Sequence, residues 1–284
     1  MMGIGRTWSL MGASWNVLKK DREILVFPLL SGISCLIVMA SFAVPVFMTE
    51  SWQPPSGEAE TLQQVIYYGT VFLFYFCNYF VITFFNCAIV ACATIRMSGG
   101  DPTVGDGLKA AISLIPAIAG WALVSATVGL ILRAIESRSE GIGRFVSGLL
   151  GMAWTLVSFL VIPAMVVERM GPIEAFKEST RLLKRTWGEQ LVSNFGFGIL
   201  FFLLALPGFG LIALGVFFLP DGGANANVLM GVVVGIGILY FLVLSLVQSA
   251  LQAIFQAALY LYARDGITPL GFESSGLDNA MSRR

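Results

Sequence analysis

Three glutamines recur at every fourth position in one of the most apolar stretches of the chain, QSALQAIFQ, as Gln248, Gln252 and Gln256. At this spacing the three side chains lie on one face of a helix. An amide that faces lipid leaves its donors and acceptors unpaired at a cost of about 2–7 kcal/mol, so this ladder must face protein or water. A second apolar stretch carries Asn78 and Asn86, and we expect both asparagines to join the glutamines on a common polar axis.

Two interpretations of this intramembrane polar ladder stay open. The first is interhelical hydrogen bonding by Asn and Gln, which stabilises helix packing by about 0.6 kcal/mol on average. The second is a hydrated site or pore lining built from uncharged polar groups. Every charged residue lies near a predicted span boundary. This argues against a proton-coupled transporter and leaves a passive channel or neutral-solute carrier open.

Chemistry that depends on histidine is excluded, because the chain contains none. Its absence removes Ser-His-Asp and Cys-His catalysis and imidazole haem ligation. The four cysteines, Cys35, Cys77, Cys87 and Cys92, lie in apolar stretches, and their spacing fits no zinc pattern. No carboxylate pair or nucleophile–base set is apparent either. We therefore expect no cofactor and no metal site, and we do not expect an enzyme.

The composition is that of a membrane protein, because 57% of the 284 residues are hydrophobic and only 12% are charged. A soluble domain carries about 25% charged residues. Apolar stretches long enough to cross a bilayer core of about 30 Å separate the charged clusters. The predicted spans lie at about 24–48, 63–95, 114–133, 145–167, 190–219 and 228–262. We predict an all-α membrane protein of six transmembrane helices, with a single domain over 1–270 and a disordered tail over 271–284.

The distribution of lysine and arginine predicts the orientation of the spans. Fourteen of the 17 basic residues lie in the N-terminal segment, in 96–110, in 168–189 and in the C-terminal tail. Basic residues gather on the cytoplasmic side of membrane proteins. We therefore expect a multi-pass protein of a prokaryotic cytoplasmic membrane, with both termini in the cytoplasm.

Amphipathic segments precede three of the spans, at 7–20, 103–115 and 172–187, and we expect each to form a helix in the plane of the lipid headgroups. In the first segment Met11 and Leu18 share the apolar face. The other side chains expected at the interface are Trp8, Trp15, Ile173, Phe176 and Trp187. The cations expected to contact lipid headgroups or a partner are Lys19, Lys20, Arg181, Lys184 and Arg185.

An amphipathic helix followed by two spans occurs three times, which predicts three degenerate repeats at about 5–97, 102–169 and 172–265. The ends of the copies are alike, since Arg96 and Arg169 are each followed within a few residues by glycine and proline. The alternative is that such turns end any cytoplasmic loop, because glycine and proline mark loops generally.

The stretch VSFLVIPAMVVERMGPIEAFKESTRLLKRTWGE, at 157–189, resembles the signature region of an uncharacterised family of bacterial and archaeal integral membrane proteins, the domain of unknown function numbered 6159. The segments at 6–32 and 99–111 are similar to the same family, so the resemblance extends over roughly 6–265. It implies a polytopic membrane protein and carries no activity with it. More distantly, interfacial helices between hairpins resemble the architecture of the CysZ-type sulfate permeases, which is an analogy of fold alone.

We expect from these observations a non-catalytic membrane component that organises a protein complex or local lipid. The alternative is a small-solute channel or transporter that uses the polar axis. The expected partners are membrane lipid and other membrane proteins or a second copy of the chain. Nucleic acid is not an expected partner, because no large hydrophilic domain is present.

Overall fold

The computed structural model describes residues 2–48, 61–137, 142–218 and 223–273, with side chains over 8–44, 61–136, 143–183, 197–216 and 228–273. All regular structure in these residues is helical. The elements are α1 (Met2–Lys20), the 3-10 helix η1 (Arg22–Leu25), α2 (Val26–Met48), α3 (Thr61–Met97), α4 (Val104–Ser113), α5 (Ile115–Ser137), α6 (Ile142–Ser158), α7 (Val161–Glu168), α8 (Pro172–Phe218) and α9 (Gly223–Asp265).

The prediction of an all-α membrane protein with six spans is confirmed. By length and composition, six helical segments of the described chain can cross a membrane. They are Arg22–Val44, Thr61–Met97, Ile115–Glu136, Gly143–Glu168, Phe197–Val216 and Val228–Asp265. The protein is therefore a multi-pass membrane protein.

The fourth span is broken between α6 and α7 at 159–160, about one turn before Pro163 of α7. Proline lacks the N–H of a helical hydrogen bond, and its ring clashes with the carbonyl four residues earlier. Ser179 of α8 repairs the break, because its buried hydroxyl accepts from the Leu160 N–H at 3.1 Å and donates to the Val157 carbonyl at 2.6 Å. The predicted span at 145–167 is thus two helices joined through a neighbouring helix.

The amphipathic segment at 172–187 and the fifth span form one helix, α8, and are not separate elements as predicted. Proline occurs at the start of α8, where the first turn tolerates it, and again only at Pro207. Pro207 lies inside α8 without ending it. The 47 residues of α8 would extend over about 70 Å if straight, which exceeds a bilayer core of about 30 Å. Part of α8 therefore lies outside the hydrocarbon.

The core lies at one end of the molecule, where α3 and α9 finish. All seven residues of 87–93 are buried, so α3 is surrounded on every side over two turns. The same is true of 257–263 in α9. Both stretches are rich in alanine, and 87–93 also contains two cysteines; such small side chains let helix backbones approach closely. Buried residues of α1, η1, α2, α4, α5, α7 and α8 complete the core.

Gly107 allows α4 to lie directly on this core. A Cβ atom at Gly107 would fall 2.6 Å from Cζ of Phe27 and 2.8 Å from Sγ of Cys92. It would also lie 3.0 Å from the carbonyl oxygen of Ala88. No larger residue fits without moving α4 away from α3.

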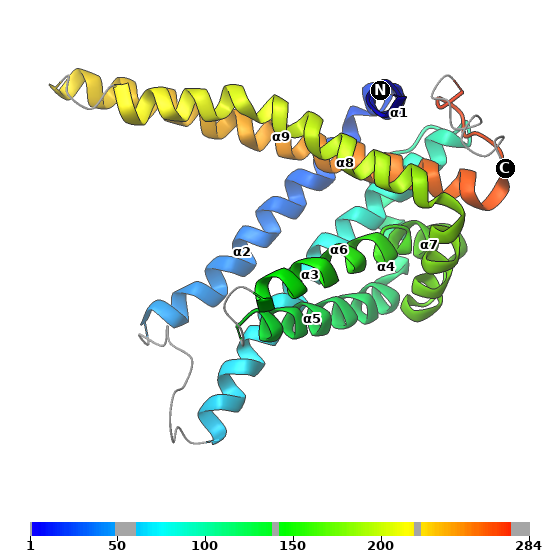
Figure 1. The fold of residues 1–284 in the computed structure, drawn as a ribbon, viewed down its shortest axis with the longest axis horizontal. Helices are drawn as coiled ribbons and strands as arrows, with labels where there is room; N and C mark the ends of the chain where they lie inside the picture. The colour runs from blue at the N-terminus through cyan, green and yellow to red at the C-terminus, as the bar shows by residue number, and fades with distance from the viewer. Residues whose placement is uncertain (1, 49–60, 138–141, 219–222, 274–284) are drawn as a thin grey trace.

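The hairpins diverge from this common end, and Figure 1 shows the α8–α9 hairpin leaving the rest of the molecule at a wide angle to α2 and α3. Within the hairpin, Gly208 and Gly237 let α8 and α9 pack closely. A Cβ atom would fall 2.8 Å from the Tyr240 ring at Gly208, and 2.7 Å from Ile212 at Gly237. By contrast, Cβ atoms at the G-x-x-x-G pair of Gly231 and Gly235 would meet nothing within 4 Å.

The order of elements follows the predicted repeats in outline, with α1 before α2 and α3, α4 before α5 to α7, and α8 before α9. The equivalence of the three units stays a prediction. The C-terminal segment differs from its prediction, because Phe272 is fully buried and 271–273 belong to the fold. The remainder of the predicted tail lies outside the described residues.

Candidate functional site

A groove of about 550 Å³ lies between α2, α3 and α9, in the angle where the hairpins separate; it is named the α2–α9 groove. Most of its wall is aliphatic or aromatic. The uncharged polar side chains on its wall are Ser31, Asn86, Ser245 and Ser249, and the described lining contains no charged residue. The apolar part is Pro28, Leu29, Ile33, Leu36, Ile82, Phe85, Ile89, Leu242 and Leu246, with Gly32 between them.

Asn86 carries the only side-chain amide among the described lining residues, and it lies deep in the membrane-spanning part of α3. It lies about 15 Å along the helix from Arg96, which is half of a bilayer core of about 30 Å. Among the described residues, the Asn86 side chain has no hydrogen-bond partner. Its amide is therefore available to a molecule that occupies the groove.

Gln248 and Asn86, which were expected on a common polar axis, line different pockets. The convergence of Gln252 and Gln256 with Asn86 stays a prediction. Gln248 borders a separate pocket of about 340 Å³ against α8, and Ser245 borders both that pocket and the α2–α9 groove. Gln252 and Gln256 continue along the same face of α9, and both are half-buried. Among the described residues, no interhelical hydrogen bond from the three glutamine amides is found. The facing turns of α8 belong to 184–196, whose side chains lie outside the description.

Asn78 donates its side-chain amide to the backbone of its own helix. Its amide nitrogen donates to the carbonyl of Phe74, one turn earlier in α3, at 2.9 Å. The two predicted asparagines therefore have different surroundings. The structure brings Asn86 together with the serines of α2 and α9, a grouping that the spacing of the polar residues along each helix could not reveal.

The predicted interfacial face of α1 divides into a buried part and an exposed part. Leu18 packs in the core at 2% exposure, whereas the side chains of Trp8 and Trp15 are 56% and 40% exposed. Lys19 places its ammonium 5.7 Å from the centroid of the Trp15 ring, in a cation–π contact. Lys20 borders a different pocket, which Arg96 also lines.

A second groove of about 390 Å³ lies between α1, α8 and α9; it is named the α1 groove. Its wall is almost entirely apolar. The residues of the wall are Trp8, Met11, Gly12, Trp15, Phe201, Leu204, Tyr240, Val243, Leu244, Val247 and Leu251.

The predicted interfacial residues of 172–187 also differ from one another. Ile173 is exposed, whereas Phe176 is half-buried in a stack with Trp121 and Trp154, at centroid distances of 6.1 and 5.6 Å. Arg181 is exposed and pairs with Glu178 at 2.6 Å, which raises the pKa of the Arg181 guanidinium. The predicted positions Lys184, Arg185 and Trp187 lie outside the described side chains.

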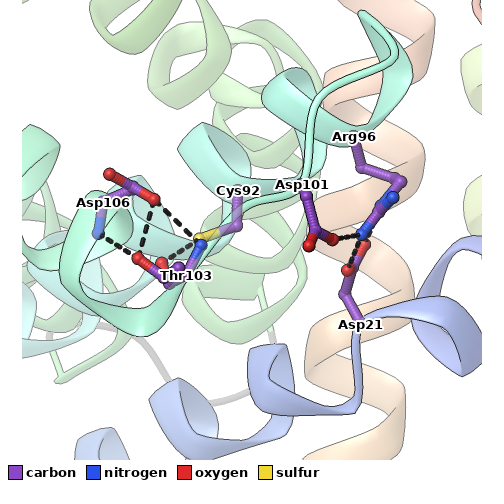
Figure 2. Close-up of polar contacts among 6 residues, drawn as sticks. All are labelled: Asp21, Cys92, Arg96, Asp101, Thr103 and Asp106. Carbon is purple, nitrogen blue, oxygen red and sulfur yellow. Dashed lines mark hydrogen bonds and ion pairs between the residues drawn. The ribbon is translucent and has the colours of Figure 1, made fainter.

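An ion-pair cluster closes the packed end of the molecule, and Figure 2 shows Arg96 directed at both Asp21 and Asp101. Arg96 donates through Nε and Nη2 to the two carboxylate oxygens of Asp21, a bidentate geometry that fixes the α1–η1 junction against the end of α3. The Asp21 side chain is only 5% exposed. Asp21 was not among the predicted site residues, because it stands in a run of charges typical of a span boundary.

Beside this cluster, Thr103 and Asp106 form a capping box at the start of α4 (Figure 2). The Thr103 hydroxyl donates to Oδ2 of Asp106 at 2.7 Å, and the Thr103 N–H donates to the same oxygen at 3.0 Å. These bonds hold the pKa of the Asp106 carboxyl below its usual value. The thiol of Cys92 donates to the Thr103 carbonyl at 3.5 Å, which ties the cap to α3.

The two named grooves have uncharged walls among the described residues. The pocket at the packed end differs, because Lys20, Arg96 and Glu273 line it. In the described parts of the chain, no cluster of three His, Cys, Asp or Glu side chains could hold a metal ion. The grooves suit apolar molecules that carry a small polar group, since binding pockets combine apolar walls with a few placed polar atoms.

The model of one protein family, the Family of unknown function (DUF6159), matches residues 65–271, which is 207 of the 284 residues. The chain belongs to this family. The DUF6159 match runs from α3 to the end of the described chain and includes both 99–111 and 157–189. It begins after the segment at 6–32. No curated protein and no solved structure matches the chain, so the architectural analogy to CysZ-type permeases stays a prediction.

Proposed function

We propose that this DUF6159 protein is a non-catalytic membrane component that organises local lipid, in a prokaryotic cytoplasmic membrane with both termini in the cytoplasm. The observation that carries the proposal is the α2–α9 groove, which opens where hairpins packed at one end diverge. A bundle packed along its whole length presents a convex surface to lipid, whereas diverging hairpins leave a wedge that other molecules must fill.

The groove wall favours lipid acyl chains as the filling material. Its exposed apolar residues include Leu29, Ile33 and Leu36 of α2, and Leu242 of α9. Contact of such surface with water costs about 25 cal/mol per Å², so an apolar occupant is favoured over water. Asn86 can hydrogen bond to an ester or hydroxyl oxygen of the same occupant, which orients it without requiring a charge.

The experiment compares lipid retention in two glycine variants. Gly32 lines the groove and Gly69 lies on α3 away from it, and a Cβ atom at either would meet nothing within 4 Å. The protein and both variants are extracted in mild detergent, washed, and analysed for bound lipid by mass spectrometry. We expect Gly32→Phe to lose at least one retained lipid per chain and Gly69→Phe to match the unaltered protein. Equal retention in all three proteins would overturn the assignment of lipid to this groove.

A second candidate function, a small-solute channel or transporter, is favoured by one observation. Uncharged polar side chains of the α2–α9 groove continue through Ser245 to the pocket that contains Gln248. An aqueous path that fills the groove would reach Ser249, which lines it one helical turn from Ser245. The four native cysteines are replaced by alanine, and Ser249→Cys is treated with a membrane-impermeant thiol reagent in vesicles of both orientations. Labelling there, with none at the lipid-exposed control Leu239→Cys, would favour the transport function over the organisation of lipid.

A further inference from the structure

We propose that the α1 groove is a binding site for one anionic phospholipid, with an acyl chain between α1 and the α8–α9 hairpin and the phosphate at Lys19. The proposal rests on the proposed lipid-organising function and gives it a second site and a lipid class. Figure 1 shows α1 lying beside the α8–α9 hairpin, where the groove is formed. The site is separate from the α2–α9 groove and shares no lining residue with it.

The wall of the α1 groove selects an acyl chain over a peptide. The single hydroxyl on its wall belongs to Tyr240, and it already donates to the carbonyl of Leu204. A peptide segment would bury its own N–H and C=O groups there without partners, at about 1–3 kcal/mol for each group. An acyl chain has no such groups. The cavity of about 390 Å³ lies between three helices and is lined by apolar side chains along its wall.

The position of α1 places the mouth of this groove at headgroup level. Trp8 and Trp15 form one wall and remain 56% and 40% exposed, and tryptophan is enriched where membrane and water meet. Lys19 and Lys20 follow directly at the end of the helix. A chain inserted between Trp8 and Trp15 therefore leaves its headgroup near the charged end of α1.

Lys19 supplies the charge that selects the headgroup. Its ammonium lies 5.7 Å from the centroid of the Trp15 ring, and Trp15 lines the groove. The nearby carboxylate of Asp21 is occupied by Arg96. Among the described residues, no ion pair neutralises Lys19. A free cation at the mouth of an apolar groove is complementary to the phosphate of a lipid whose headgroup adds no positive charge of its own.

The experiment measures binding of phosphatidylglycerol and phosphatidylcholine to the full chain in detergent by native mass spectrometry. Gly12 lies in the groove wall, and a Cβ atom there would meet nothing within 4 Å, so the side chain of Gly12→Phe starts in open space within the groove. Gly12→Ala controls for the change in helix propensity. Lys19→Gln removes the cation, and Lys177→Gln, an exposed lysine of α8 remote from the groove in sequence, controls for net charge.

We expect the unaltered protein to prefer phosphatidylglycerol over phosphatidylcholine by about fivefold, the effect of one lysine near a lipid phosphate. Lys19→Gln should abolish the preference and retain binding, whereas Lys177→Gln should change neither. Gly12→Phe should abolish the site for both lipids, and Gly12→Ala should leave it intact. Thermal unfolding midpoints identify a variant that fails to fold. If Gly12→Phe fails to fold, the lipid preference of Lys19→Gln tests the inference.

Two results would overturn the inference. One is an unchanged phosphatidylglycerol preference in Lys19→Gln, and the other is unchanged lipid binding in a folded Gly12→Phe variant. If Gly12→Phe has no effect while Gly32→Phe still loses lipid, the inference fails and the proposed function stands. If both variants retain all lipid, both fail.

Discussion

The Asp21–Arg96 pair is expected to be the most sensitive polar contact at the packed end of the molecule, and Asp21→Asn tests it. The Asp21 side chain is 5% exposed and that of Arg96 is 22% exposed. The substitution leaves Arg96 with Asp101 as its remaining partner, and the Asp101 side chain is 90% exposed. Breaking a buried ion pair by removing one partner costs about 3–5 kcal/mol. Because Arg96 keeps one exposed partner, we expect a loss of about 2–3 kcal/mol.

The assay uses the native cysteines of the core. Cys87 and Cys92 are 0% and 2% exposed, so a thiol-reactive fluorescent dye reports their exposure as the protein unfolds in a graded detergent denaturation. A loss of about 2–3 kcal/mol corresponds to a change in the unfolding equilibrium of roughly a hundredfold. Asp101→Asn is the matched control, because it removes the other carboxylate from the same arginine. That exposed contact should be worth less than about 1 kcal/mol.

The reasoning is refuted if Asp21→Asn and Asp101→Asn destabilise equally, since burial would then not determine the cost. A double variant with Asp21→Asn and Arg96→Gln separates two causes of the loss. If the penalty arises from an unpaired guanidinium, the double variant should be more stable than Asp21→Asn alone. If it is less stable, the loss has another origin.

Gly107→Ala should destabilise the protein by about 1–3 kcal/mol in the same dye assay, because the new methyl group falls 2.6 Å from Cζ of Phe27; an unchanged midpoint would mean that α4 can move away freely. Ser179→Ala should cost about 1–3 kcal/mol, since its buried hydroxyl joins the two halves of the fourth span, whereas Ser179→Thr should restore part of the loss. The lowered pKa of Asp106 predicts a contribution to stability that is present above the usual carboxyl pKa of about 4 and is lost as the pH falls through the lowered value. Asp106→Asn should flatten this acid dependence of the unfolding midpoint, and a profile that keeps its full slope would contradict the role of the Thr103 cap.

The intramembrane polar residues show how far a one-dimensional pattern can locate a site. Their helical spacing correctly placed Gln248, Gln252 and Gln256 along one face of a single helix. It could not determine which helix lies opposite that face. The angle between the α8–α9 hairpin and α2–α3 puts Gln248 and Asn86 in separate pockets, and that angle depends on packing between residues far apart in the chain.

The class of protein and the six spans follow from the amino-acid sequence alone, because apolar length and charge distribution act locally along the chain. The break in the fourth span does not, since Pro163 and Pro207 both lie inside predicted spans and only Pro163 accompanies a break. The sequence also determined that α1 is amphipathic, although not which of its apolar residues meet protein and which remain exposed. Tertiary structure decided the pairing of Asp21 with Arg96, which are 75 residues apart, and the contact of Gly107 with Phe27. It likewise decided the two grooves, since the wall of each is formed by helices that are far apart in the chain.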